Sequence, residues 1–419
     1  MELFSLSPEL MKKAETAERK SLKTFYRIEK NCRHNSQKVL KAFIDNNVSE
    51  MHLKGTTGYG YGDDGRDKAD RVFADIVGAE DALVRYNFVN GTHALSTMLF
   101  GILRPNDTML AVTGAPYDTL EQVISGDRGG SLKEFGVKFE QIDLLPDGRP
   151  DLEEIKKRAK TAKMVYIQRS RGYSLRPSLS VSVIAEICEA VRGAGSNAVI
   201  AVDNCYGEFC EYVEPTSVGA DIIVGSLIKN PGGGICSTGG YIAGKADLVE
   251  LCSYRLTTVG TGKEVGCSLG MQNRELFMGM YNAPLAVSNA LKTAVFASAF
   301  FEELGFEAFP KSDEYRTDII TSIKLGTPER LIAFCEGIQA YSPVDSSAAP
   351  EPWDMPGYNC QVIMAAGCFT MGSSIELSAD APLREPYAVW LQGGTSYHGA
   401  ATGIIGAAQR LLDKKLLTI

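Results

Sequence analysis

The chain has 419 residues and a formal net charge of −8, and 44% of its residues are hydrophobic and 22% charged. This length suggests two or three domains, and the composition is that of a globular chain that can bury a sizeable core. The acidic balance and the absence of a Lys/Arg-rich stripe argue against a nucleic-acid partner, and no run of 18 apolar residues predicts a membrane span.

The N-terminal stretch MELFSLSPELMKKAE lacks an apolar core behind a basic flank, so no signal peptide is expected. The ten cysteines show no C-x-x-C pair, and the chain has only four histidines. We therefore expect reduced, mostly buried thiols in a cytoplasmic protein, and no metal site.

The first elements in chain order are helical. Residues 7–47 are expected to form two helices, and a glycine-rich segment (55–65) separates them from an amphipathic helix over 66–80. Strands and helices then alternate as far as about residue 285. We expect strands at 82–88, 107–114, 163–168, 198–203, 221–226 and 239–244, and helices at 92–103, 117–124, 151–160 and 182–192. Uniformly apolar strands that alternate with helices predict an α/β fold with a mostly parallel sheet.

The regular alternation of strands and helices ends after Pro284. An Ala-rich helix (284–304) leads to apolar segments, a helix from Pro328 and a C-terminal helix from about residue 398. This pattern is typical of a smaller α+β domain. The expected organisation is an N-terminal helical arm (1–55), a large α/β domain (56–285) and a small C-terminal domain (286–419).

The segment Gly60–Gly65 spells G-x-G-x-x-G, the dinucleotide-binding fingerprint. That fingerprint requires a preceding buried strand, whereas the residues before Gly60 are polar and broken by glycines. Asp63 and Asp64 would also face the pyrophosphate and repel it. The match is therefore interpreted as a coincidence, which argues against a nicotinamide-dependent dehydrogenase.

Two neighbouring strands end in residues that carry chemistry. Asp203 ends the strand AVIAVD, and Lys229 follows three residues after Ser226, which ends DIIVGS. Ligands of open α/β sheets bind at this carboxyl edge. A lysine that forms a Schiff base and an aspartate that pairs with a pyridinium nitrogen are what pyridoxal 5'-phosphate requires. The pair predicts this cofactor.

The cofactor phosphate requires a cradle and the ring requires a cover. Gly91 and Thr92 begin a helix after a strand, where backbone N–H groups suit a phosphate, and Ser226 can add a hydroxyl. Tyr117 follows the next strand and is expected to stack on the ring, with His93 as the rival candidate.

A substrate carboxylate is matched best by the planar fork of an arginine. Arg384, in the C-terminal domain, is our choice for this role. Arg169 and Arg171, in the segment YIQRSRGY, are the alternatives from the large domain.

The stretches VDNCYGEF and GSLIKNPGGG, the Gly-Thr-His helix start and the closing QGGTSYHG make the chain resemble the fold-type-I pyridoxal-phosphate enzymes. It is most similar to the methionine γ-lyase-like family, whose members are also labelled aluminium-resistance proteins or carbon–sulfur lyases. The resemblance covers nearly the whole chain.

The resemblance implies that Lys229 is the Schiff-base lysine, Asp203 the partner of the ring nitrogen, Tyr117 the stacking tyrosine and Ser226 a phosphate ligand. Relatives also carry a Tyr-x-Arg segment that crosses to a neighbouring subunit and binds its cofactor phosphate. The counterpart here is Tyr59 or Tyr61 with Arg66, at a different spacing. Relatives usually have Asn-Pro where this chain has YIQRSRGY, and Arg171 is the residue that could replace it. A homodimer or homotetramer with active sites at the subunit interface follows.

The implied activity is β- or γ-elimination from a sulfur amino acid, which yields a thiol, a 2-keto acid and ammonia by way of the Lys229 Schiff base. An aminotransferase, an aldolase of β-hydroxy amino acids and a non-catalytic protein that has kept the fold are the alternatives, and a stacking His93 would favour the aldolase. The substrate stays open, because pocket shape discriminates between such amino acids by only ~1–3 kcal/mol.

Overall fold

The computed structural model describes residues 3–355 and 358–419, and the chain divides into two compact units. One unit, here called the α/β unit, is Asn35–Ala283, and the other, the terminal unit, combines Met1–His34 with Pro284–Ile419. The division at Pro284 lies next to the boundary expected at residue 285. The first 34 residues group with the C-terminal part of the chain, so the N-terminal segment is not a unit of its own.

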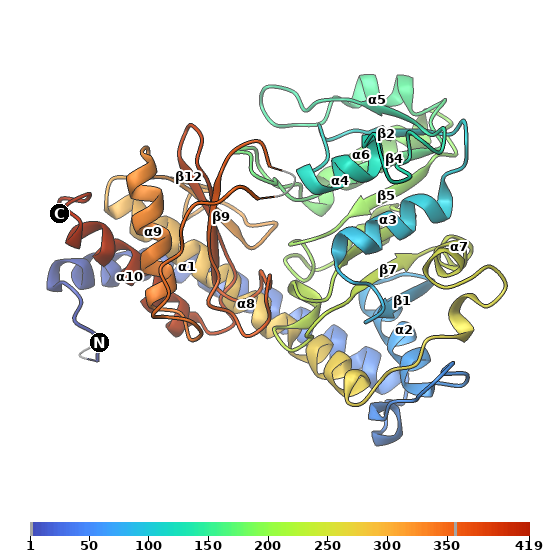
Figure 1. Cartoon of the computed structure of the whole chain (residues 1–419), viewed down its shortest axis with the longest axis horizontal. Helices are drawn as coiled ribbons and strands as arrows, with labels where there is room; N and C mark the ends of the chain where they lie inside the picture. The colour runs from blue at the N-terminus through green and yellow to red at the C-terminus, as the bar shows by residue number, and fades with distance from the viewer. Residues whose placement is uncertain (1–2, 356–357) are drawn as a thin grey trace. The chain divides into compact units, whose positions relative to one another are not determined.

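A seven-stranded sheet forms the centre of the α/β unit, in the order β1-β7-β6-β5-β4-β2-β3 (Figure 1). β7 runs antiparallel to its neighbours β1 and β6, and all other neighbours are parallel. The predicted α/β fold with a mostly parallel sheet is confirmed. The strands are β1 (Asp81–Arg85), β2 (Thr108–Ala111), β3 (Lys138–Gln141), β4 (Met164–Gln168), β5 (Val199–Asp203), β6 (Ile222–Ser226) and β7 (Gly240–Gly244).

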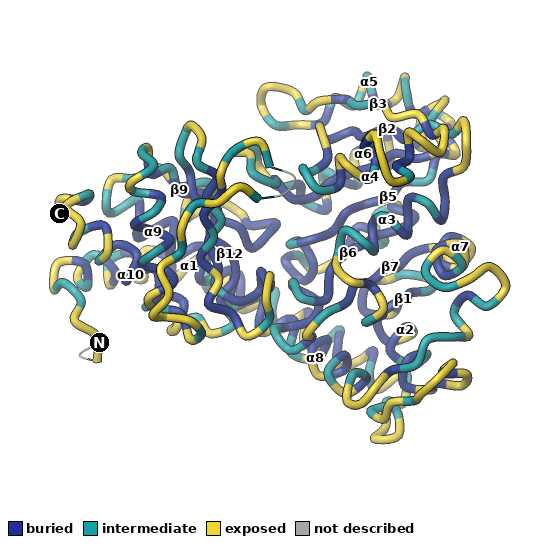
Figure 2. The backbone as a smooth tube through the Cα atoms, in the orientation of Figure 1, coloured by how far each residue is buried: buried dark blue, intermediate teal, exposed yellow. Residues whose placement is uncertain are grey.

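Both faces of this sheet are covered by helices. One face packs in a single hydrophobic cluster with α3, α4 and α7, to which Met98, Leu120 and Val249 belong. On the other face Tyr241 of β7 packs against Phe73 of α2, with the ring centroids 4.6 Å apart. Figure 2 shows the strands of this sheet as largely buried. The helices are α2 (Asp64–Val77), α3 (Gly91–Ile102), α4 (Asp118–Ser125), α5 (Leu152–Arg158), α6 (Val181–Gly193) and α7 (Ala246–Leu256).

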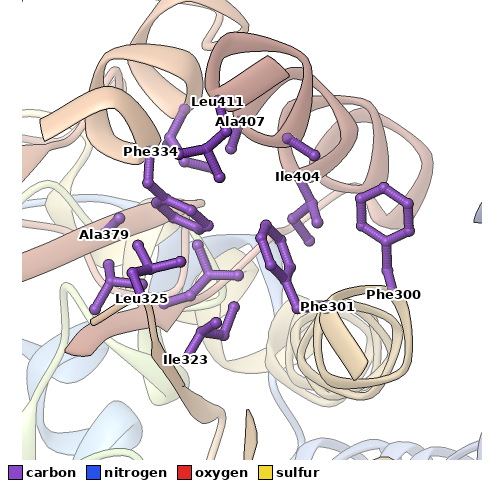
Figure 3. Close-up of a cluster of buried hydrophobic side chains, with 14 of the residues drawn as sticks. Phe300, Phe301, Ile323, Leu325, Phe334, Ala379, Ile404, Ala407 and Leu411 are labelled. Carbon is purple, nitrogen blue, oxygen red and sulfur yellow. The ribbon is translucent and has the colours of Figure 1, made fainter. Parts of the chain in front are cut away.

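The terminal unit contains a five-stranded antiparallel sheet in the order β10-β11-β12-β9-β8. Its core is built from Phe301, Phe334, Ile323 and Leu411 among others, and Figure 3 shows these side chains converging. The elements are β8 (Glu307–Phe309), β9 (Ile320–Lys324), α9 (Pro328–Ala340), β10 (Val362–Ala365), β11 (Ser378–Pro382), β12 (Ala388–Gln392) and α10 (Tyr397–Asp413).

Two long helices differ from the sequence prediction. The N-terminal residues form one helix, α1 (Pro8–Asp45), where two were expected. Helix α8 (Gln272–Glu303) begins twelve residues before Pro284 and runs through it. Proline removes a backbone donor and normally ends a helix, but Phe277, Met280 and Ala283 are buried, so packing maintains the helix across this point. By length and composition α8 is apolar enough to cross a membrane, but 83% of its most apolar window is buried inside the protein.

Some elements were missed or shifted. β3, α7, β8 and β12 were not predicted, and one of the apolar segments expected in the C-terminal domain, 374–377, lies just before strand β11, which begins at Ser378. β3 is half-exposed and short, which leaves little hydrophobic pattern to recognise.

Candidate active site

Three of the predicted residues lie at one edge and on one face of the seven-stranded sheet. Asp203 is the last residue of β5 and Ser226 the last residue of β6. Side chains alternate along a strand, and Ala201 and Val224, two residues earlier, belong to the cluster beneath α3. Asp203 and Ser226 therefore point to the face that α3 covers. Gly91, the first residue of α3, lies against Ser226.

Lys229 lies in the turn after β6, and its Nζ lies 4.0 Å from the ring centroid of Tyr206. Tyr206 was not singled out in the sequence, although it belongs to the motif VDNCYGEF. Its φ of 71° is in the left-handed region, which is costly for a bulky residue and concentrates at functional sites. This backbone conformation is invisible in the sequence.

The charges of Lys229 and Asp203 are coupled. Burial raises the pKa of Asp203, while Lys229 and the backbone N–H of Cys205, which donates to Oδ1 over 3.1 Å, act against that rise. Burial would lower the pKa of Lys229, but Cys205, Tyr206, Asp203 and Tyr117 outweigh it, so its pKa lies well above the ordinary value. A buried carboxylate needs a cation or donors around it, and this site places both next to Asp203.

The start of α3 approaches the end of β6 closely. Asn90 caps the helix by accepting from the backbone N–H of His93 over 2.8 Å. A Cβ added at Gly91 would lie 3.1 Å from Cβ of Ser226, so a side chain there would fill the space between helix and strand. A helix N-terminus beside a serine hydroxyl suits a phosphate.

Tyr117 is held at both ends. Its hydroxyl lies 2.9 Å from Oγ1 of Thr92, and its backbone N–H donates to Oε1 of Gln168 over 2.8 Å. Gln168, the last residue of β4, was missed in the sequence because a strand-ending glutamine carries no chemistry of its own. The ring of His93 instead packs edge-on against Phe88, with centroids 5.8 Å apart, and its Nδ1 accepts from the N–H of Val89.

The three candidate arginines have different surroundings. Arg169 is fully buried, and its guanidinium donates to Glu211 and Asn204 over 2.7 Å each, so it braces the interior and is not available to a substrate. Arg171 is also buried, in the loop after β4. Arg384 is exposed in the turn between β11 and β12 of the terminal unit.

The glycine-rich loop presents Tyr59 and Tyr61 to solvent. The two side chains are 75% and 64% exposed, and their ring centroids lie 5.7 Å apart. Arg66 behaves differently from the expectation, because it is buried and its Nη1 donates to the carbonyls of Gly60 and Gly266. Arg66 therefore braces the loop from inside, while the tyrosines project from it.

A pocket of about 330 Å³ in the α/β unit contains none of the predicted site residues. It lies at the opposite edge of the sheet, where β1 and β6 begin, and Asp221 there binds both Arg192 and Lys245. Its lining charges compensate one another, so it offers no excess charge to a ligand. The lining residues are Gly78, Ala79, Glu80, Arg192, Thr216, Gly219, Ala220, Asp221, Gly244 and Lys245.

The residues present fit pyridoxal phosphate. The glycine at position 91 keeps the space beside Ser226 open, and Asp203, at the end of β5, is a buried carboxylate that could accept a hydrogen bond from a ring nitrogen. Lys229 and Tyr117 both interact electrostatically with that carboxylate.

Comparison with known proteins identifies the family. The profile of the methionine gamma-lyase family matches residues 10–412. A carbon-sulfur lyase involved in aluminum resistance from Clostridium novyi NT is 48% identical, with a TM-score of 0.93 over 97% of this chain and 96% of that one. The Bacillus subtilis (strain 168) protein YnbB is 46% identical over 394 residues, 93% of each chain. The L-methionine gamma-lyase of Pseudomonas putida is 26% identical over 210 residues, 49% of this chain and 46% of that protein. The family expected from the sequence is confirmed, and the chain belongs to the methionine gamma-lyase family.

Proposed function

We propose that this protein is a pyridoxal-phosphate-dependent carbon–sulfur lyase that eliminates a thiol from a sulfur amino acid. The observation that carries the proposal is the placement of Asp203 at the end of β5 and of Lys229 in the turn after β6, at the carboxyl edge of the sheet. The name of the Clostridium novyi relative, a carbon-sulfur lyase, supports the same reaction class.

Each side chain has a role in this proposal. Lys229 would hold the cofactor through its amino group, and the same amino group would move the proton of the substrate Cα. Asp203 would accept a hydrogen bond from the ring nitrogen, and Tyr117 would cover the ring. When bound, the cofactor stabilises negative charge at Cα. Tyr117, whose pKa burial raises, keeps its proton and can donate it to the departing sulfur.

The phosphate is assigned to the backbone of Gly91 and Thr92 and to the Ser226 hydroxyl. His93 is not assigned to the phosphate, because its backbone N–H donates to Asn90 and its ring contacts Phe88. A His93 ring stacked on the cofactor was the feature that favoured an aldolase, and the observed ring orientation does not support that alternative.

We further propose that the active enzyme is a cytoplasmic homodimer or homotetramer in which Tyr59 or Tyr61 reaches the cofactor phosphate of a neighbouring subunit. The exposure of both aromatic side chains on a loop braced by Arg66 supports this, because large exposed aromatics are costly unless a partner covers them.

The test combines cofactor attachment with product analysis. The protein is mixed with pyridoxal phosphate, reduced with borohydride and mapped by peptide mass spectrometry, and the adduct is expected on Lys229. Sulfur amino acids are then screened for release of thiol, 2-keto acid and ammonia. An adduct on another lysine overturns the proposal, as does turnover that requires a keto-acid acceptor, that yields an aldehyde, or that is absent with every amino acid.

A further inference from the structure

A buried tyrosine hydroxyl in the proposed site has no hydrogen-bond partner among the described residues. Tyr166 lies in the middle of β4, its side chain is 0% exposed, and its hydroxyl is enclosed by the protein. An unpaired buried hydroxyl destabilises a fold, and phenylalanine would avoid that cost. A tyrosine at this position is therefore better explained by a functional role of its hydroxyl than by stability.

The register of the sheet places Tyr166 beside Asp203. Tyr166 pairs with Ala201 and Gln168 pairs with Asp203 in the parallel β4–β5 ladder. Residues in register share a face, so the side chains of Tyr166 and Asp203 lie on the same side of the sheet, one diagonal step apart. Long side chains reach across such a step.

The chemistry of the two groups is complementary. Burial, followed by the nearby Asp203 carboxylate, raises the pKa of the Tyr166 hydroxyl well above its ordinary value, so it keeps its proton and can only donate to a carboxylate. Tyr166 in turn acts against the rise in the pKa of Asp203. The hydroxyl lies close enough to Asp203 to stabilise its carboxylate, but the contact falls outside the geometry of an ordinary hydrogen bond.

We propose that Tyr166 is a positioning residue that donates its hydroxyl proton to Asp203 in the cofactor-loaded protein and so holds Asp203 ionised opposite the ring nitrogen. This inference rests on the proposed function. Asp203 then has two donors, the Cys205 backbone N–H and the Tyr166 hydroxyl. With both in place, the shared proton stays on the ring nitrogen, where it is needed to stabilise charge on the substrate.

The test is the ¹⁵N chemical shift of ring-labelled pyridoxal phosphate bound to the full-length protein. In Tyr166→Phe the signal is expected to move toward that of an unprotonated pyridine, and the cofactor dissociation constant to rise roughly tenfold. The cofactor-free variant is expected to unfold at the same temperature as the wild type or higher. Tyr241→Phe is the matched control, since Tyr241 is equally buried in the same sheet but lies on the opposite face, and its ¹⁵N signal is expected to be unchanged.

An unchanged ¹⁵N signal in Tyr166→Phe overturns the inference while leaving the proposed function intact. Failure of the wild type to form a Lys229 adduct overturns the proposed function itself, so the two failures are distinguishable. If Tyr166→Phe does not fold, 3-fluorotyrosine at position 166 provides a second variant with a more acidic hydroxyl. Measured at a pH where the wild-type signal is intermediate, it is expected to move the signal toward the protonated value, and no movement overturns the inference.

Discussion

The hydroxyl of Tyr117 lies 2.9 Å from Oγ1 of Thr92, so the side chain expected to cover the cofactor ring is tied to the helix start expected to bind the cofactor phosphate. Tyr117 is also fixed through its backbone by Gln168, at the end of β4. The ring is therefore held in place from two elements before any ligand arrives, and such preorganisation lowers the cost of binding.

Removing the Tyr117 ring is expected to cost more than removing its hydroxyl. In Tyr117→Phe the bond to Thr92 is lost, and the pyridoxal-phosphate dissociation constant is expected to rise by less than about tenfold. Tyr117→Ala also removes the stacking surface, and a rise well beyond about tenfold is expected. Fluorescence titration measures both, with Tyr254→Phe, a tyrosine bonded to Glu250 on α7, as the control. Wild-type affinity in Tyr117→Ala would contradict the stacking role.

Gly91→Ala is expected to weaken cofactor binding by at least tenfold with a small effect on stability. The added Cβ would lie 3.1 Å from Cβ of Ser226, inside the space assigned to the phosphate. Gly101→Ala is a matched control on the same helix, because its Cβ would meet Cα of Cys252 at the same 3.1 Å but away from the site. Titration with pyridoxal phosphate and thermal unfolding are compared for both variants. Equal cofactor affinities would show that Gly91 does not shape the cradle.

The stability of the cofactor-free protein is expected to fall as pH rises from about 4.5 to about 8 because of Glu208. Burial raises the pKa of Glu208 to about 8 from its ordinary 4.5, although Tyr241 donates to it over 2.8 Å. The folded state therefore holds a proton that the unfolded state releases within this window. The stabilisation is complete below pH 4.5 and is lost as pH passes 8, and the difference is on the order of a few kcal/mol.

Glu208→Gln carries no ionisable proton and is expected to remove this dependence. Relative to the wild type, the variant should gain stability as pH increases from 5 to 9, as measured by urea unfolding at each pH. The exposed Glu186→Gln serves as the control and is expected to follow the wild type. A Glu208→Gln curve parallel to the wild type across this range would contradict the assignment.

Hybrid oligomers test whether Tyr59 and Tyr61 act across a subunit boundary. Lys229→Ala and the double variant Tyr59→Phe/Tyr61→Phe are each expected to have little activity. In a hybrid dimer, one site combines an intact Lys229 with intact tyrosines from its partner. Random mixing by co-refolding or co-expression should then restore about a quarter of wild-type activity, since half of the dimers carry one complete site of two. No recovery in verified hybrids would mean that the tyrosines act within their own chain.

The positions of Asp203, Ser226 and Lys229 were predictable because buried parallel strands leave a strong pattern and their carboxyl ends share one edge. The other strands of this sheet, apart from the half-exposed β3, were predictable because they are buried and apolar. The family could be named because its motifs surround these strand ends.

Other features were not predictable because they depend on contacts between distant segments. The burial of Arg169 against Glu211, the brace formed by Arg66 and the orientation of His93 toward Phe88 all require the folded arrangement. The continuation of α8 through Pro284 is likewise decided by tertiary packing, which overrides the local preference. The position of the Tyr166 hydroxyl beside Asp203, without an ordinary hydrogen-bond partner, can be recognised only once the register of β4 against β5 is known.

Arg384 and Arg171 are the two candidates for binding the substrate carboxylate, and lysine substitutions at each position distinguish between them. An arginine-to-lysine substitution keeps the positive charge but removes the bidentate fork. Replacing the arginine that binds the carboxylate should therefore lower the affinity of the enzyme for its substrate. We expect Arg384→Lys to raise KM for a sulfur amino acid by at least about tenfold with a smaller change in kcat, in line with the loss of one charge-assisted bond.

Arg149→Lys, at an exposed turn, is the control and is expected to leave both constants unchanged. Inhibition by the decarboxylated substrate analogue provides a second readout, because it lacks the group that the arginine binds. In Arg384→Lys its inhibition constant should stay at the wild-type value while KM for the amino acid rises. If Arg171→Lys shows this selective loss instead, the carboxylate belongs to Arg171, and a loss in neither variant would exclude both arginines from the role.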